Sequence, residues 1–174
     1  MLLVLFSDPM NATSALNLAT ANSIVNRQGI SLQWLHKAHL PEVIAIEQMV
    51  SPSPWGKLQF VDSTESTLLL IENHRVIGFA VVQLVADQAE LHNIAIHPDR
   101  QGQGIGSLFL NALIKAMPTV IKMFYLEVRV TNYRAIRLYH QLGFAQIAER
   151  KDYYRSGLGR EDALVMAKVI AQLE

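Results

Sequence analysis

HPDRQGQGIGSLFLNALIKAM, residues 97–117, carries glycine at every second position: Gly102, Gly104 and Gly106. The preceding residues AELHNIAI (89–96) predict a strand, and the apolar residues after the glycines recur at helical spacing and predict a helix. A helix begins with unpaired backbone N–H groups and a partial positive charge. Glycine lets the main chain approach an anion with no Cβ in the way. A strand, a glycine loop and a helix in this order therefore predict a pyrophosphate site.

The spacing of the glycines separates this loop from two common phosphate-binding loops. It is not G-x-G-x-x-G, because the third glycine comes one residue early, and it is not G-x-x-x-x-G-K-[ST], because no lysine follows. It does fit the pattern Q/R-x-x-G-x-G/A over residues 101–106. Taken alone, the run is open to a second interpretation, a flexible loop that caps a helix without binding a ligand.

Length and composition limit the classes of protein that fit. The chain has 174 residues, 51% of them hydrophobic and 17% charged, with a formal net charge of zero, which predicts one soluble globular domain. Neutrality argues against nucleic acid as the main partner, since phosphate binding needs a basic excess. The absence of cysteine excludes disulfides, thiolate catalysis and cysteine-ligated zinc. The six histidines show neither H-x-x-x-H nor H-x-H spacing, so no metal site is expected.

The N-terminal residues 1–29 differ in character from the rest. MLLVLF (1–6) is too short to span a membrane, and the first basic residue is Arg27, so the pattern of a signal peptide is missing. We therefore expect a cytoplasmic protein. Residues 1–29 have weak periodicity and predict either a mobile arm or a short helix on the body, whereas residues 30–174 predict the globular domain.

Periodicity after residue 29 predicts an α/β fold with a central mixed sheet. Alternating or β-branched runs predict strands at 30–35, 66–72, 75–85, 89–97, 123–130, 144–151 and 161–169. Amphipathic runs predict helices at 40–50, 105–116 and 132–142. The residues expected on the buried face of the first helix are Leu40, Val43, Ile44 and Met49. Turn residues predict that 152–160 is a loop between the last two strands.

Two residues outside the glycine loop have side chains suited to proton transfer. Glu127 is the lone acid in the strand FYLEVRV, where alternation places it on one face with Tyr125 and Arg129. A carboxylate there is either a general base or a surface group paired with Arg129 or another basic residue. Tyr139 lies on the apolar side of the next helix, as either a proton donor or a core residue with its hydroxyl bonded. The pattern alone leaves both pairs of interpretations open.

Two longer segments carry a resemblance to a known family. LEVRVTNYRAIRLYHQLGF (126–144) fits L-E-V-R-x-x-N-x-x-A-I-x-L-Y-x-x-L-G-F, and Tyr153-Tyr154 stands ahead of GREDALVM (159–166). With the glycine loop, these segments resemble the GNAT acetyltransferases, and among them the RimI-type protein N-terminal acetyltransferases, over about residues 30–168. The resemblance implies a GNAT fold: a central, mixed, mostly antiparallel, twisted sheet of about seven strands flanked by about four helices.

The resemblance also implies an activity and roles for individual residues. The activity is transfer of an acetyl group from acetyl-CoA, without a metal, to the N-terminal alanine of a small-subunit ribosomal protein by direct attack of the α-amine. Glu127 would be the general base and Tyr139 the general acid toward the CoA thiolate. The residues implied to hold the cofactor are Ile94, Ala95, Ile96, Gly102, Gln103, Gly104, Ile105, Gly106, Ser107 and Asn132. Those implied to border the peptide are Trp55, Tyr153 and Tyr154.

The glycine loop departs from the family in its charge. Relatives often carry arginine or lysine inside this loop and directly after it, where this chain has Gly102 and Ser107. Arg100 is the candidate that we considered for the missing charge.

Two other functions stay open at this point. The first is a GNAT enzyme that acetylates a small amine or a lysine side chain, because the fold alone does not select the acceptor. The second is a non-catalytic acyl-CoA sensor, against which the presence of both Glu127 and Tyr139 argues. For partners, we expect the N-terminus of a ribosomal protein, with no direct nucleic acid and no membrane, and we expect a monomer.

Overall fold

The structure is a computed structural model that describes residues 15–26, 29–156 and 159–170. Its strands are β1 (Ile30–Trp34), β2 (Thr67–Glu72), β3 (Arg75–Val85), β4 (Gln88–Ile96), β5 (Met123–Arg129), β6 (Ala145–Ser156) and β7 (Gly159–Val169). Its α-helices are α1 (Leu18–Val25), α2 (Leu40–Val50), α3 (Lys57–Asp62), α4 (Ile105–Ala116) and α5 (Tyr133–Gln141). The first half of the expected arm, residues 1–14, lies outside the described residues. Within those ranges, no helix combines the length and the apolar character needed to cross a bilayer.

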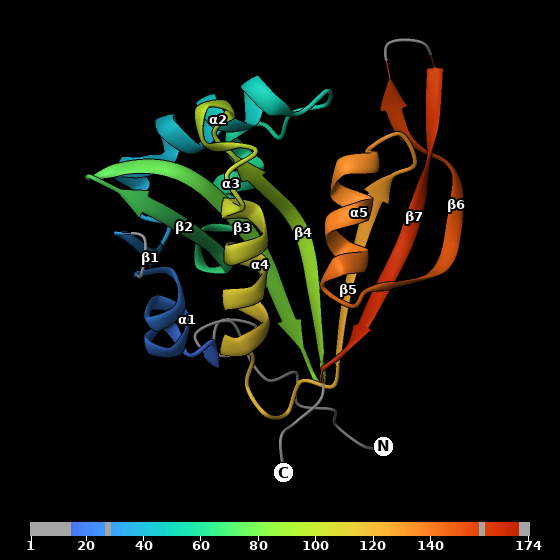
Figure 1. Cartoon of the computed structure of the whole chain (residues 1–174). Coiled ribbons are helices and arrows are strands. Elements are labelled where there is room, and N and C mark those ends of the chain that lie inside the picture. The colour runs from blue at the N-terminus through green and yellow to red at the C-terminus, as the bar shows by residue number, and fades with distance from the viewer. Residues whose placement is uncertain (1–14, 27–28, 157–158, 171–174) are drawn as a thin grey trace, which may run out of the picture.

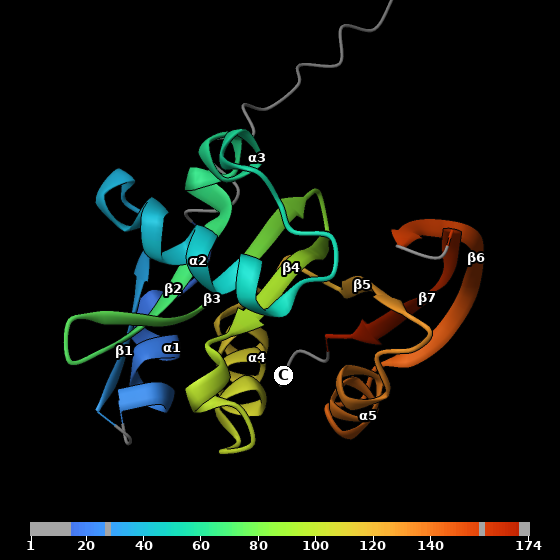
Figure 2. The ribbon, with the colours of Figure 1, turned by 90° about the horizontal axis from the view of Figure 1, so that it is seen from above.

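A seven-stranded sheet in the order β1-β2-β3-β4-β5-β7-β6 runs through the molecule (Figure 1). Strands β4 and β5 pair in parallel, and the other neighbouring strands pair in antiparallel fashion. Helices α2 and α3 cover one face of the sheet, and α1, α4 and α5 cover the other (Figure 2). The predicted fold class, a mixed and mostly antiparallel sheet flanked by helices, is confirmed, with five α-helices in the described residues where about four were expected.

The buried stripe of α2 differs from the predicted one. Met49 was expected on the buried face, but it is 53% exposed. The residues of α2 that are buried are Leu40, Val43, Ile46 and Glu47. Met49 follows Val43 by six residues, about 240° around a helix at 3.6 residues per turn, so it points away from the sheet. The stripe is therefore narrower than the apolar composition suggested, and it includes a carboxylate.

Strands β4 and β5 pair along only part of their length. Residues 88–91 pair with residues 123–126, and beyond this point the two strands diverge (Figure 1). A β-bulge lies at the same place, because Val81 pairs with Asn93 whereas Val82 pairs with Leu91, which leaves His92 as the extra residue. The second half of β4 thus has β3 on one side and an opening on the other.

Helix α1 covers the outer edge of the sheet at β1. The Asn22 side chain accepts a hydrogen bond from the Leu32 N–H at 2.7 Å and donates one to the Leu32 carbonyl at 3.1 Å. Ala21 and Val25 of the same helix are buried in the core. An edge strand carries unpaired backbone groups, and the Asn22 amide satisfies those of Leu32 as a neighbouring strand would.

The C-terminal hairpin corrects one local prediction. Residues 152–160 were predicted to be a loop, but β6 continues to Ser156 and pairs with β7. The register shifts between Arg150 and Tyr154, where Asp152 has a φ of 52°. The chain accommodates its turn-forming residues in a bulge, so the strand bends and continues. Helix α3 was not predicted either, because six residues are too few to show a helical period.

Candidate functional site

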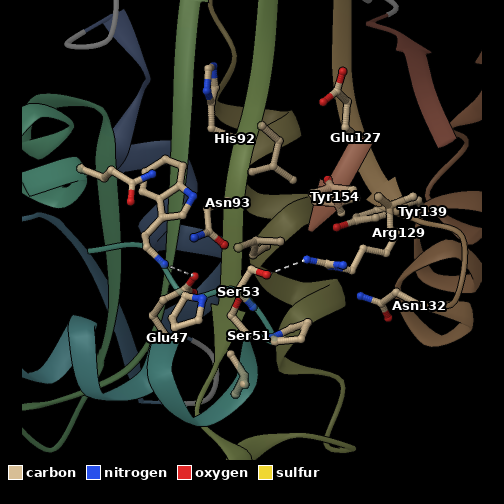
Figure 3. Close-up of a pocket in the computed structure, with 18 residues that line it drawn as sticks. Glu47, Ser51, Ser53, His92, Asn93, Glu127, Arg129, Asn132, Tyr139 and Tyr154 are labelled. Atoms are coloured by element: carbon tan, nitrogen blue, oxygen red, sulfur yellow. Dashed lines mark hydrogen bonds between the residues drawn. The ribbon is translucent and has the colours of Figure 1, made fainter. Parts of the chain in front are cut away.

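Two adjoining cavities lie where strands β4 and β5 diverge. One, of about 410 Å³, is lined by residues 101, 102 and 104–107 and by α5, and we term it the glycine-loop cavity. The other, of about 390 Å³, is lined by residues 50–55, β4 and β5, and we term it the Glu127 cavity (Figure 3). The residues that line both are Val50, Ile94, Asn132 and Tyr139. The two cavities therefore meet beside Tyr139.

The glycine loop leads the chain from β4 into α4. Gly102 and Gly104 have φ values of 79° and 78°, in the left-handed region that glycine adopts without strain. Gly104 is the N-cap residue of α4, and within the described residues no side chain caps this helix. The first N–H groups of α4 therefore lack intrahelical acceptors, and residues 104–107 line the cavity. This is the geometry of an anion site at a helix start.

Most residues predicted to hold the cofactor lie around the glycine-loop cavity. Its lining includes Ile94, Ala95, Ile96, Gly102, Gly104, Ile105, Gly106, Ser107 and Asn132. Gln103 is the exception, because its side chain donates to the Asp99 carbonyl at 2.8 Å and accepts from Arg100 at 3.1 Å. Gln103 thus folds back onto the loop instead of lining the cavity.

The positive charge at this cavity comes from α5. Arg134 and Arg137, one helical turn apart, both line it, and Arg134 donates to the Gln101 side-chain oxygen at 3.1 Å. Arg100 pairs with Glu72 instead and is not among the residues that line the cavity. The hydrogen bond that Arg100 donates to Glu72 raises the pKa of Arg100 above its usual range. Arg134 and Arg137, which were not predicted, therefore supply the positive charge that the glycine loop itself lacks.

Glu127 lies on the wall of the second cavity and is paired. Its side chain is 27% exposed, and Arg150 Nη1 donates to its Oε1 at 2.5 Å. Arg150 also lies 5.0 Å from the centroid of the Tyr153 ring. The interpretation as a paired surface carboxylate named Arg129 as one partner; the partner is Arg150, on the neighbouring hairpin. The pairing leaves Glu127 in contact with the cavity, so it does not exclude the general-base interpretation.

Tyr139 has a ring that packs in the core and a hydroxyl that is available as a proton donor, so both interpretations of the sequence apply to it. Its ring is in the core, 5.9 Å from Phe144 between centroids, and the residue is 5% exposed. Its hydroxyl points into the Glu127 cavity (Figure 3). Burial, with a smaller contribution from Tyr154, raises the pKa of Tyr139 well above its usual value. The phenol is therefore protonated at neutral pH and can donate its proton to a group at the junction of the cavities.

Glu47 lies at the end of the cavity opposite Glu127 and was not predicted (Figure 3). It is 2% exposed, and its Oε1 accepts the Trp55 N–H at 3.0 Å. The Trp55 ring packs on Phe60 at 5.5 Å between centroids. The sequence could have indicated this position, because a glutamate four residues after Val43 lies on the buried face of α2. A buried carboxylate thus fixes the segment that carries Trp55.

Tyr153 and Tyr154 lie on strand β6 and contribute to the lining of two cavities. Tyr154 lines the Glu127 cavity, and both tyrosines line an adjoining cavity of about 550 Å³ together with Trp55 and Glu127. Burial raises the pKa of Tyr154 to about 12, and the hydrogen bond with Glu127 raises the pKa of Tyr153. Both phenols are therefore neutral hydrogen-bonding groups at physiological pH. The predicted peptide-side residues lie near one another although about a hundred residues separate them.

Asn132 has a structural contact at the start of α5. Its side chain accepts the Ala135 N–H at 3.2 Å, as an N-cap residue does. The cap holds the amide in place where the two cavities meet, and contact with a cofactor stays a prediction.

The chemistry of the site follows from this set of groups. In the parts of the chain that the structure describes, no three His, Asp or Glu side chains gather as metal ligands would. The cavities offer a helix start with two arginines, a carboxylate and a protonated phenol. This set can bind a phosphorylated carrier in one cavity and move protons to and from an acceptor in the other. The arrangement is suited to group transfer.

The chain is similar in sequence and in fold to known proteins. The model of the acetyltransferase (GNAT) family matches residues 31–144. The chain is 38% identical over 145 residues to the ribosomal protein bS18-alanine N-acetyltransferase of Escherichia coli K12, covering 81% of this chain and 98% of the relative. It is 43% identical over 127 residues to the enzyme of the same name from Haemophilus influenzae, covering 70% and 86%. The crystal structure of the Escherichia coli ribosomal-protein-S18-alanine N-acetyltransferase aligns with a TM-score of 0.75 and 36% identity, covering 83% of this chain and 96% of that chain.

Proposed function

We propose that this chain, which belongs to the GNAT family of acetyl-CoA-dependent acetyltransferases, acetylates the N-terminal alanine of ribosomal protein bS18. The observation that carries the proposal is the junction of the glycine-loop cavity and the Glu127 cavity at Tyr139. A donor in the first cavity and an amine in the second would meet beside a proton donor. The activity named for the two bacterial relatives supports the choice of acceptor.

The glycine-loop cavity is assigned to acetyl-CoA, which supplies an acetyl group activated as a thioester. The N–H groups at the start of α4 would bind its phosphates, and Arg134 and Arg137 would neutralise their charge. The backbone of residues 94–96 pairs with β3 on one side and lines the cavity with the other. Backbone N–H and C=O groups on that side suit the amide-bearing arm of the carrier, and one of them, the Ile96 carbonyl, accepts from the Gln101 side chain at 2.9 Å in this structure.

Glu127 is assigned the role of general base. An α-amino group has a pKa of about 8, so at pH 7 most of it is the unreactive ammonium form. A carboxylate in the acceptor cavity can take that proton directly or through a water molecule. Arg150 donates to Oε1 of Glu127, and the carboxylate has further lone pairs that can accept the amine proton. The pair also orients the carboxylate on the cavity wall.

Tyr139 is assigned the role of general acid. The leaving thiolate must be protonated or otherwise stabilised, and the buried phenol keeps its proton at neutral pH. Since Tyr139 lines both cavities, its hydroxyl can act where the carrier's sulfur and the acceptor meet. No covalent enzyme intermediate is required, which agrees with a chain that has no cysteine.

The proposed acceptor indicates the cellular compartment of the enzyme. A ribosomal protein is made in the cytoplasm, and we place the enzyme there. Both cavities are lined by one chain, which supports activity as a monomer. We assign catalysis to residues 30–174 and a supporting role to the arm of residues 1–29, whose helix α1 packs on α4.

The test is an acetylation assay with three acceptors. The purified protein is given acetyl-CoA and a peptide with the N-terminal sequence of bS18, the same peptide with a blocked α-amine, or a polyamine. The proposal predicts acetylation of the free α-amine only. Transfer to a lysine of the blocked peptide or to the polyamine would favour the small-amine or lysine alternative. Binding of acetyl-CoA without transfer to any acceptor would favour the sensor.

A further inference from the structure

We propose that Arg129 is a positioning residue that ties the 51–55 segment to the β6–β7 hairpin and so sets the width of the acceptor cavity. Arg129 stands in the LEVR segment, and its partner Glu161 stands in the GREDA segment. Both segments marked the sequence as a RimI-type enzyme, and the catalytic assignments leave both of these residues unused.

The guanidinium of Arg129 joins three parts of the chain. Its Nη1 donates to Glu161 Oε2 at 2.8 Å, and its Nη2 donates to Ser53 Oγ at 3.1 Å and to the Arg155 carbonyl at 3.1 Å. Ser53 Oγ donates in turn to the same Arg155 carbonyl at 3.0 Å. The contact between Ser53 and Arg129 crosses the cavity face in Figure 3. The 51–55 segment and the hairpin, a hundred residues apart, are thus linked by the Arg129 guanidinium and by one direct hydrogen bond from Ser53.

The partly buried position of Arg129 and Glu161 strengthens the ion pair between them. The side chains of Arg129 and Glu161 are 12% and 15% exposed. Glu161 also accepts from the hydroxyl and the N–H of Thr131, and the Thr131 hydroxyl contributes most to holding its pKa below the usual range. A charged pair that is shielded from water is stable when further hydrogen bonds satisfy both partners, as they do here. Arg129 is therefore held in one orientation.

Two walls of the acceptor cavity depend on that orientation. Arg129 lies 4.3 Å from the centroid of the Tyr154 ring, which gives a cation–π contact with one wall. Trp55 also lines this cavity, and its segment is fixed to Glu47 at one end and to Arg129 through Ser53 in its middle. Two prolines in the segment further restrict its backbone. Arg129 thus sets the distance between Trp55 and Tyr154, between which an acceptor peptide would pass.

The inference rests on the proposed function for its account of the peptide, so its test needs two kinds of readout. The first is kinetic: the KM for the bS18 N-terminal peptide, the KM for acetyl-CoA and kcat, measured separately. The second needs no substrate: hydrogen exchange of the backbone over residues 51–56 in the free protein. A residue that only stabilised the fold would change all of these in proportion to the loss of stability.

Ser53→Ala removes the link at its exposed end and leaves the Arg129–Glu161 pair in place. We expect the peptide KM to rise about two- to tenfold, in keeping with the net contribution of a hydrogen bond, with kcat and the acetyl-CoA KM nearly unchanged. Exchange over residues 51–56 should become faster. Ser53→Thr keeps the hydroxyl and should restore both readouts. Ser23→Ala removes a hydroxyl that donates to the Thr20 carbonyl within α1, outside both cavities, and is the matched control.

Arg129→Lys keeps the charge but cannot reach three acceptors and the Tyr154 ring together, so its peptide KM should rise more than that of Ser53→Ala. The inference is overturned if Ser53→Ala leaves the peptide KM and the exchange unchanged, or if Arg129→Lys raises both KM values equally. A wild-type protein that is inactive on the peptide contradicts the proposed function instead. The exchange measurement then still decides whether Arg129 holds the segment.

Discussion

The two cavities are built in different ways. About half of the residues that line the glycine-loop cavity come from one continuous stretch, where β4 runs through the loop into α4, and most of the others come from α5. The Glu127 cavity is lined by residues from parts far apart in the sequence: α2, the 51–55 segment, α3, β4, β5, α5 and β6. In the proposed function, the first cavity binds the carrier that the family shares, and the second distinguishes one acceptor from another. A change in the first should affect the carrier, and a change in the second should affect the acceptor.

The largest effect is expected from Glu127→Gln, which keeps the shape of the acceptor cavity but removes the base. Turnover at pH 7 should fall by about 10²- to 10⁴-fold, the usual contribution of general base catalysis. The loss should shrink as the pH rises past about 8, because the amine then loses its proton to solvent. Steady-state kinetics across this range, with acetyl-CoA affinity by calorimetry as the control, measures both. Unchanged kinetics would remove Glu127 from the mechanism.

Tyr139→Phe tests the residue that the two cavities share. The ring and its packing on Phe144 are retained, so the melting temperature should stay nearly the same while turnover falls by about 10- to 100-fold. In the wild type, burial raises the pKa of Tyr139, so the proton is lost only well above the usual value. Activity should therefore not decline between about pH 8 and pH 10, where a free tyrosine begins to ionise. A melting temperature that falls without a loss of turnover would reduce Tyr139 to a core residue.

Gly104→Ala tests the glycine-loop cavity. No other atom crowds the added methyl group, but a φ of 78° costs an L-residue about 1–2 kcal/mol. We expect the KM for acetyl-CoA to rise by about tenfold as the loop relaxes, with the peptide KM unchanged. Gly29→Ala is the matched control, because Gly29 has a φ of 71°, equal free space and a place outside both cavities. An equal effect of both substitutions on acetyl-CoA would mean that strain alone is responsible.

Asn22→Ala should have the smallest effect on activity. It leaves the N–H and carbonyl of Leu32 without their partner on α1, at a cost of about 1–3 kcal/mol. The melting temperature should fall by several degrees, roughly 2–4 °C per kcal/mol in a chain of this size. Both KM values and kcat at 25 °C should stay unchanged, since neither cavity includes α1. Altered kinetics would extend the functional unit into the N-terminal arm.

The same contrast explains what could be predicted from the sequence. The glycine loop was recognisable because its function depends on neighbouring residues and on the strand and helix that flank them. Glu127 and Tyr139 were selected by their family pattern, since spacing alone left each open to a structural interpretation.

Residues whose contacts are distant in the chain were missed. Arg134 was overlooked because only the packing of α5 brings it to Gln101, 33 residues earlier. Glu47 was hidden in an amphipathic helix, and the partner of Glu127 was not identifiable before the hairpin placed Arg150 beside it. The turn-forming residues around Asp152 predict a loop, but in the structure they form a bulge inside strand β6. Side-chain contacts across a sheet depend on its register, which local patterns do not encode.

The most direct test of the central claim is the mass of bS18 from ribosomes of the source cells, with and without the gene for this protein. The account predicts that bS18 carries one acetyl group on its N-terminal alanine in the first case and none in the second. Restoring the wild-type gene should return the acetyl group, and restoring the Glu127→Gln variant should not. An N-terminus that stays acetylated without the gene, or that is never acetylated, would contradict the assignment of bS18 as the acceptor.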